Sequence, residues 1–151
     1  MVDFVVDWRP TGQPEGSEAL RACLRCVEAD VETFECDLPV RDSQPSDARR
    51  AWAVLIGAAR KPRRSPPATG VLRPGDENVW EAFVTFAPHA LDGSVWTVDG
   101  DGRPAVHFAD EGTAITVRLT DEQRVRLSDR LPDGVALVPL QEWRARRHGR
   151  A

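Results

Sequence analysis

Short apolar runs separated by glycine-containing turns fill the second half of the chain. The runs are NVWEAFVTF (78–86), SVWTV (94–98), PAVHFA (104–109) and TAITVRL (113–119), and the turns between them contain LDG, DGDG and DEG. Runs of β-branched and aromatic residues bounded by such turns are typical of antiparallel strands. We therefore expect these four segments to form a β-meander, with further strands at residues 2–8 and 135–140.

The lengths of the turns predict which side chains share a face of this meander. A four-residue ADEG turn would pair Phe108 with Thr113. A three-residue turn before it would pair Trp96 with Val106. Because side chains alternate between the faces of a sheet, these pairings define two faces. The apolar one comprises Trp96, Val98, Val106, Phe108, Ile115, Val117 and Leu119, and the other carries His107.

Apolar residues at spacings of three and four predict helices in the remaining segments. We expect a first helix from an N-cap at Ser17 through Phe34. A second helix is expected at residues 46–59, with a buried strand at 51–57 as the alternative. Thr120 and Gln123 match a capping box, which predicts a short helix after the meander. The fold class is therefore α+β, an antiparallel β-meander sheet with helices packed on one face.

The pair Cys23-x-x-Cys26 resembles a redox or metal motif, but its position favours packing. A redox pair needs its first cysteine at a helix N-terminus, and these residues fall about two turns into the expected helix. A structural zinc site needs four ligands. The third thiol is Cys36, and the nearest histidine is His89. We therefore expect buried thiols, with no metal and no cofactor.

The charge is unevenly distributed along the chain. The net charge is −4, and every basic residue except Lys61 is an arginine, which is typical of a bacterial genome of high GC content. Residues 49–64 and 144–150 together carry ten positive charges and no acid, which leaves −14 on the rest. The pattern predicts an acidic body with two arginine segments.

A long proline- and arginine-rich loop is expected at about residues 60–76, within a single domain of residues 1–140. Residues 141–151 form a basic C-terminal tail. Long loops inside compact domains are often functional, and arginine and tryptophan are enriched at interface hot spots. The candidate partner-binding residues are Arg60, Arg63, Arg64 and Arg73 of the loop with Trp143 and Arg146 of the tail.

Motifs that would specify an enzyme are absent from the sequence. It contains no G-x-S-x-G, P-loop, G-x-G-x-x-G or H-E-x-x-H. Asp99 and Asp101 have calcium-loop spacing, but Arg103 and Pro104 occupy positions that the motif cannot accept. His107, on the polar face of the sheet, and His89, in a turn near Asp92, are the candidates for a ligand pocket.

These observations favour a non-catalytic protein-interaction module of accessory, regulatory or immunity type. One alternative is a small enzyme or ligand-binding domain with a pocket beside the sheet that uses His107 or His89. Nucleic-acid binding through the arginine segments is disfavoured, because the acidic remainder repels phosphates. The acidic N-terminus is unlike a signal peptide, and the longest apolar run, AWAVLIGAA, is about half as long as a membrane span. We expect a cytoplasmic protein with no membrane association.

Overall fold

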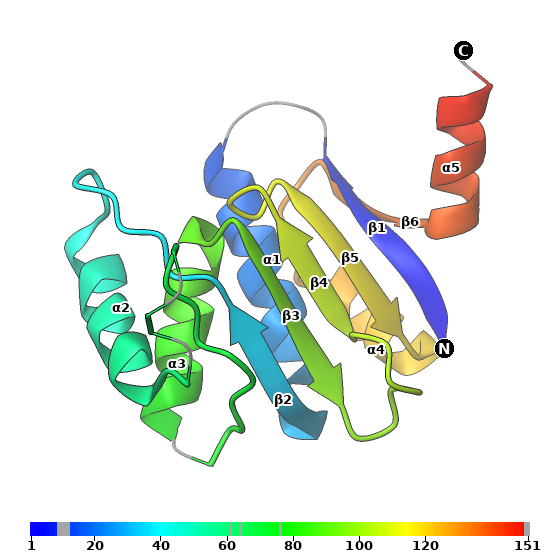
Figure 1. Ribbon diagram of the computed structural model, residues 1–151. Coiled ribbons are helices and arrows are strands. Elements are labelled where there is room, and N and C mark those ends of the chain that lie inside the picture. Colours follow the sequence, from blue (N-terminus) through cyan, green and yellow to red (C-terminus); the bar gives the residue numbers. More distant parts are fainter. Residues whose placement is uncertain (9–12, 61, 64, 76, 150–151) are drawn as a thin grey trace.

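The chain forms one antiparallel sheet with helices against it (Figure 1). The computed structural model describes residues 1–8, 13–60, 62–63, 65–75 and 77–149. Within them lie the strands β1 (Val2–Trp8), β2 (Val31–Cys36), β3 (Asp92–Thr97), β4 (Val106–Ala109), β5 (Ala114–Leu119) and β6 (Val135–Pro139). Their order is β2-β3-β4-β5-β1-β6, so a four-strand meander is followed by β1, inserted between β5 and β6. The α+β class and the antiparallel, meander-like sheet are confirmed.

The described residues also form the helices α1 (Gln13–Val27), α2 (Ser46–Ala58), α3 (Glu77–Phe86), α4 (Asp121–Ser128) and α5 (Leu140–His148). In Figure 1, α1, α3 and α4 lie behind the sheet, and α2 packs against α3 at the β2 side. At the opposite edge, α5 follows β6 and contacts β1 and β6. The face of the sheet turned toward the viewer carries none of the helices α1–α4.

The core lies between the covered face of the sheet and the helices. Phe83 of α3 is fully buried, and its ring contacts Phe34 of β2 and Phe108 of β4 at centroid distances of 4.6 and 6.0 Å. Trp80 stacks on Phe83 at 5.5 Å. Aromatic pairs at these distances add to the stabilisation from burial alone. This cluster connects α3 to two strands of the meander.

The bounds expected for the first helix, Ser17 through Phe34, were wrong at both ends. Helix α1 begins at Gln13 and ends at Val27, a 3₁₀ turn covers Glu28–Asp30, and β2 follows. In β2 the buried residues alternate with partly exposed ones, and Phe34 and Cys36 point into the core. The apolar residues at 31 and 34 fit a helical stripe, but the segment VETFEC also alternates with the period of a strand.

The strand expected at residues 78–86 was also wrong, because this segment is helix α3. Its valine, tryptophan and phenylalanine content is typical of strands. Its buried residues, which include Trp80, Phe83 and Phe86, nevertheless follow helical spacing. Packing against α2 and α1 outweighs the strand propensity of these residues. The fourth strand of the meander is β2 instead.

The expected pairing register was wrong in both hairpins, with different consequences. Phe108 pairs with Ile115, because the β4–β5 turn has Asp110, Glu111 and Gly112 in the left-handed region and closes one residue later than expected. That change keeps the same residues on the apolar face. In the other hairpin Val106 pairs with Val95, one residue away from Trp96. A slip of one residue exchanges the faces, so Trp96 lies opposite the core.

Three other expectations were confirmed. Residues 46–58 form helix α2, which excludes the alternative strand. Thr120 and Gln123 form the capping box of α4, with the Gln123 amide donating to Thr120 Oγ1 at 3.2 Å. β6 forms at Val135–Pro139. Most of the basic tail is helix α5, and the division of the chain at residue 140 stays a prediction.

Gly93 and Phe108 provide a test of this register and of the core. They face each other across β3 and β4, and a Cβ at position 93 would lie 2.2 Å from Phe108 Cζ. We expect Gly93→Ala to destabilise the protein by about 1–3 kcal/mol, the usual cost of overpacking a core. Gly57→Ala is the control, because nothing lies within 4 Å of its Cβ position in α2. It should be neutral or slightly stabilising. Urea unfolding measures both, and equal effects would contradict the register.

The three thiols are expected to be unreactive in the folded protein. Cys23 and Cys26 lie on α1 and Cys36 on β2, all buried, and burial raises the pKa of each thiol. Because the thiolate is the reactive form, Ellman's reagent should label the native protein slowly and label all three thiols in urea. Cys26 should react first, since 9% of it is exposed. Rapid labelling of Cys23 in the native protein would contradict its placement in the core.

Candidate functional site: the bare face of the sheet

Helices α1–α4 leave one face of the sheet open, and we call it the bare face. Helix α5 lies over its β1 end, where Trp143 and Arg147 line a hollow together with Val5 and Asp7. The bare face carries the strand residues that alternate with the core residues. They are Asp3, Val5 and Asp7 of β1, Thr33 and Glu35 of β2, Asp92, Ser94 and Trp96 of β3, His107 and Ala109 of β4, Ala114, Thr116 and Arg118 of β5, and Ala136 and Val138 of β6. Most of these residues are partly or fully exposed.

Ser94, His107 and Asp92 lie together on the bare face, where Ser94 and His107 are hydrogen-bonded and Asp92 lies at ion-pair distance from His107. Ser94 and His107 are direct cross-strand partners, with Ser94 Oγ 3.0 Å from His107 Nδ1. Asp92 Oδ1 lies 3.7 Å from His107 Nε2. A hydroxyl, an imidazole and a carboxylate in this order resemble a nucleophile site. Ser94, however, lies inside a central strand whose amides are used in sheet pairing, so no pair of free amide donors flanks its hydroxyl as an oxyanion hole requires.

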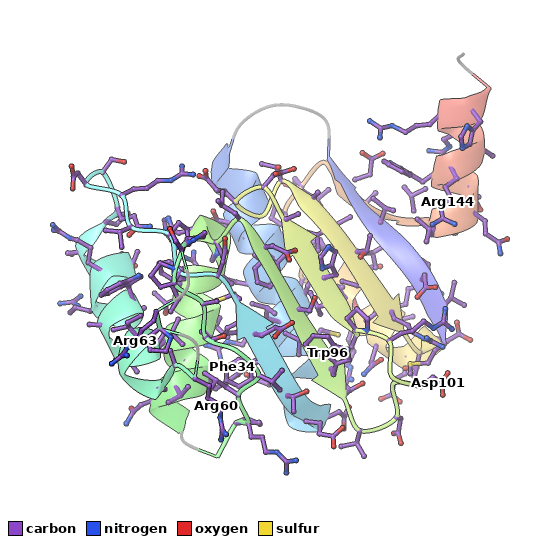
Figure 2. All side chains as sticks on the ribbon, in the orientation of Figure 1. Phe34, Arg60, Arg63, Trp96, Asp101 and Arg144 are labelled. Carbon is purple, nitrogen blue, oxygen red and sulfur yellow. The ribbon has the colours of Figure 1, made fainter. Side chains whose placement is uncertain are left out.

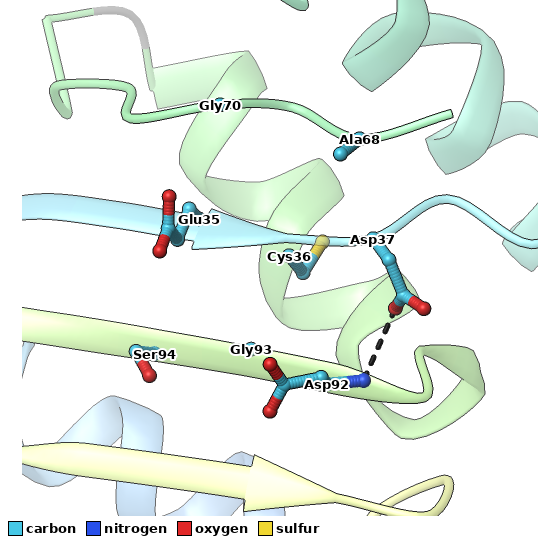
Figure 3. Close-up of a pocket in the computed structure, with 8 residues that line it drawn as sticks. All are labelled: Glu35, Cys36, Asp37, Ala68, Gly70, Asp92, Gly93 and Ser94. Carbon is cyan, nitrogen blue, oxygen red and sulfur yellow. Dashed lines mark hydrogen bonds between the residues drawn. The ribbon is translucent and has the colours of Figure 1, made fainter. Parts of the chain in front are cut away.

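A small cavity of about 170 Å³ lies beside this group, between β2, β3 and the loop that follows α2 (Figure 3). Glu35, Asp37 and Asp92 contribute three carboxyl groups to its lining, and none of the residues that line it is basic. Asp37 Oδ1 accepts hydrogen bonds from the amides of Leu91 and Asp92 at 2.8 and 3.1 Å. Burial raises the pKa of Asp37. The cavity is therefore suited to a positively charged group.

Arg118 is the only arginine or lysine in the six strands. Its side chain is 8% exposed, and its Nη2 donates to Asp101 Oδ2 at 2.9 Å. Its Nε and Nη1 are buried without hydrogen-bond partners. The single positive charge of the strands is therefore buried and partly neutralised, and the exposed charges that the strands themselves bring to the bare face are carboxylates.

The candidate partner-binding residues are divided between two edges of the sheet. Arg60, Arg63 and Arg73 are exposed in the loop that borders β2, whereas Trp143 and Arg146 lie on α5 at the β6 edge. Figure 2 shows the same separation for Arg60 and Arg63 on one side and Arg144 on the other. Arg64 lies outside the described residues. These residues do not form one continuous surface.

Part of the loop at 60–76 is built into the fold. Leu72 exchanges two backbone hydrogen bonds with Phe34, both 2.9 Å, and the Thr69 amide donates to the Cys36 carbonyl at 2.9 Å. Thr69 and Leu72 are buried. This part of the loop therefore covers the outer edge of β2, while the arginines on either side of it remain exposed.

The two histidines have different surroundings. His107 belongs to the group on the bare face, whereas His89 is half-buried in a 3₁₀ turn after α3, with its ring 6.1 Å from that of Phe86. The acid expected near His89 is instead in contact with His107. The sequence pointed to His107, but Ser94 was missed, because only the correct register of β3 and β4 places it opposite His107.

No family model, no curated protein and no solved structure matches this chain. Among the described residues no helix is long and apolar enough to cross a membrane. In the same part of the chain, no three His, Cys, Asp or Glu side chains are grouped to hold a metal ion.

The environment of His89 predicts a pH dependence of stability. Burial, followed by the charge of Arg21, lowers the pKa of His89 below its usual 6.5. The unfolded state then binds more protons than the folded state just below pH 6.5, so the free energy of unfolding should fall as the pH decreases through this range. His89→Asn should reduce that dependence. Proton NMR titration should give a midpoint below 6.5, and a midpoint above that value would contradict this assignment.

Proposed function

We propose that this protein is a non-catalytic interaction module, of accessory, regulatory or immunity type, that binds a basic partner protein on the bare face. The observation that carries the proposal is the one-sided covering of the sheet. Helices α1–α4 bury one face, and the other presents partly exposed polar and aromatic side chains on the strands β1 to β5. Protein interfaces combine such side chains on rigid elements.

The charge of the bare face indicates the kind of partner. Asp3, Asp7, Glu35 and Asp92 contribute carboxylates from three strands. Arg118 is buried against Asp101, and Asp3 is paired with Arg103 at 3.7 Å, so Glu35 and Asp92 carry most of the charge argument. A surface of one sign attracts a partner of the opposite sign and increases the association rate. The same charge repels a phosphate backbone, so the bare face disfavours nucleic acid.

The chemical groups on the bare face support binding better than catalysis. Ser94 and His107 can exchange hydrogen bonds with a partner, and Trp96 belongs to the residue type that is most enriched at binding hot spots. The serine lacks the amide donors that acyl transfer needs. We therefore assign His107 a role in recognition in this proposal.

The arginine segments would flank such an interface. One segment lies at the β2 edge and the other at the β6 edge. A partner centred on the bare face would meet the loop segment only at its rim, where charges contribute more to the association rate than to affinity. It would meet the tail segment at Trp143 and Arg147, which line a hollow with bare-face residues of β1 and β5.

Charge reversal on the bare face tests the proposed function. Glu35→Lys with Asp92→Lys should abolish capture of a basic protein partner, and the matched control Glu18→Lys with Asp129→Lys should retain it. Glu18 and Asp129 are exposed on α1 and after α4, away from the bare face. With the purified partner, the affinity should fall about ten-fold or more in the bare-face variant, and wild-type binding should weaken with salt.

The opposite pattern would place the interface elsewhere. If the bare-face variant keeps its partner while Arg60→Gln with Arg63→Gln loses it, the exposed loop is the binding surface and the proposal is wrong. All variants must first show the same cooperative unfolding as the wild type, so that a loss of binding is not a loss of folding.

A further inference from the structure

A second cavity, of about 290 Å³, opens on the bare face where β2 and β3 meet the loop after β3. Its lining includes Glu32, Val71, Trp96, Val98 and Asp101, together with the backbone of the glycines at 100 and 102. These residues come from β2, β3, the loop that covers the β2 edge, and the loop between β3 and β4. Three segments that are distant in sequence, at residues 32–33, 71 and 96–102, thus converge on one hollow.

The apolar part of the cavity is unusually exposed for aliphatic side chains. Val98 is 71% exposed and Val71 is 49% exposed, and both line the same cavity as Trp96. Neighbouring exposed apolar side chains that form a hollow are typical of binding sites. Covering them would remove apolar surface from water, which favours binding.

The polar part of the cavity is negatively charged. Glu32 and Asp101 are its two ionisable lining residues, and none of the residues that line it is basic. The buried side chain of Arg118 donates a hydrogen bond from Nη2 to Asp101 Oδ2 at 2.9 Å. The backbone of Asp101 is in the left-handed region, at φ 50°. Arg118 offsets part of the charge of Asp101, so Glu32 supplies most of the attraction for a cation.

We propose that this cavity is the anchor site of the bare face and that it receives an arginine side chain of the partner. The inference rests on the proposed function. A guanidinium can stack on an indole ring and bind a carboxylate, and Trp96 and Glu32 offer both. The methylene stem of the arginine would cover Val71 and Val98. A purely apolar group would instead leave the carboxylate of Glu32 desolvated and unpaired.

The probe for this site is N-acetyl-arginine N-methylamide, and its citrulline counterpart has nearly the same shape without the charge. In ¹⁵N-resolved NMR spectra, the arginine probe should shift the Trp96 indole signal and the amides of Val71 and Val98 saturably. The citrulline probe should bind at least about ten-fold more weakly than the arginine probe. Both titrations use the full chain.

Two variants separate this cavity from its acidic neighbour. Glu32→Gln should weaken binding of the arginine probe about five-fold or more, because it removes the unpaired charge. Glu35→Gln, on the same strand but lining the smaller cavity, should change it less than about two-fold. The inference is wrong if the arginine and citrulline probes bind equally well. It is also wrong if the arginine probe shifts only the NMR signals of Glu35, Asp92 and His107.

The outcomes also separate this inference from the proposed function. If charge reversal at Glu35 and Asp92 abolishes partner capture but the arginine probe does not bind the cavity, the bare face is the interface and the anchor assignment is wrong. If the probe binds as expected but partner capture survives charge reversal, the cavity binds cations and the proposed function is wrong. A loss of partner affinity in Glu32→Gln, with capture also lost on charge reversal, supports both.

Discussion

The ring of Phe108 lies over Gly93, and the composition of the bare face depends on this contact. A Cβ at position 93 would overlap the ring, so Phe108 needs a glycine opposite it. That pairing sets the register of β3 and β4, and the same register places Ser94 opposite His107. Phe108 in turn contacts Phe83 of α3. Core packing on one face therefore determines which polar groups meet on the other.

One-sided burial explains why the strands look as they do in the sequence. Helices α1–α4 cover only one face, so β2, β3 and β4 alternate between buried and partly exposed positions. This alternation made the strands of the second half recognisable, and the capping box identified α4. The same reasoning assigned residues 78–86 to a strand, although they form α3. Their three aromatic residues lie at helical spacing, but aromatic residues also have high strand propensity. This reasoning also misplaced β2, because residues 31 and 34 continue the helical spacing of α1.

The candidate site was harder to predict than the fold, because it depends on pairings between distant segments. His107 could be assigned to the polar face from alternation alone. Its contact with Ser94 and Asp92 requires the register, which an error of one residue changes completely. The cavity lined by Trp96 depends further on where the loops at 71 and 98–102 return to the sheet. The arginine segments were conspicuous in the sequence, but their placement at opposite edges follows only from the strand order.

The edges of the sheet narrow the ways in which a partner can bind. An unpaired edge strand can accept an extra strand from another chain, but the outer edge of β2 is already bonded to Thr69 and Leu72. At the other edge, β6 is short, ends in Pro139 and leads directly into α5. A proline provides no amide donor to an added strand. Both edges are thus protected against strand addition, and for this reason the proposed interface uses the side chains of the bare face, with its carboxylates and half-buried Trp96, and not an added strand.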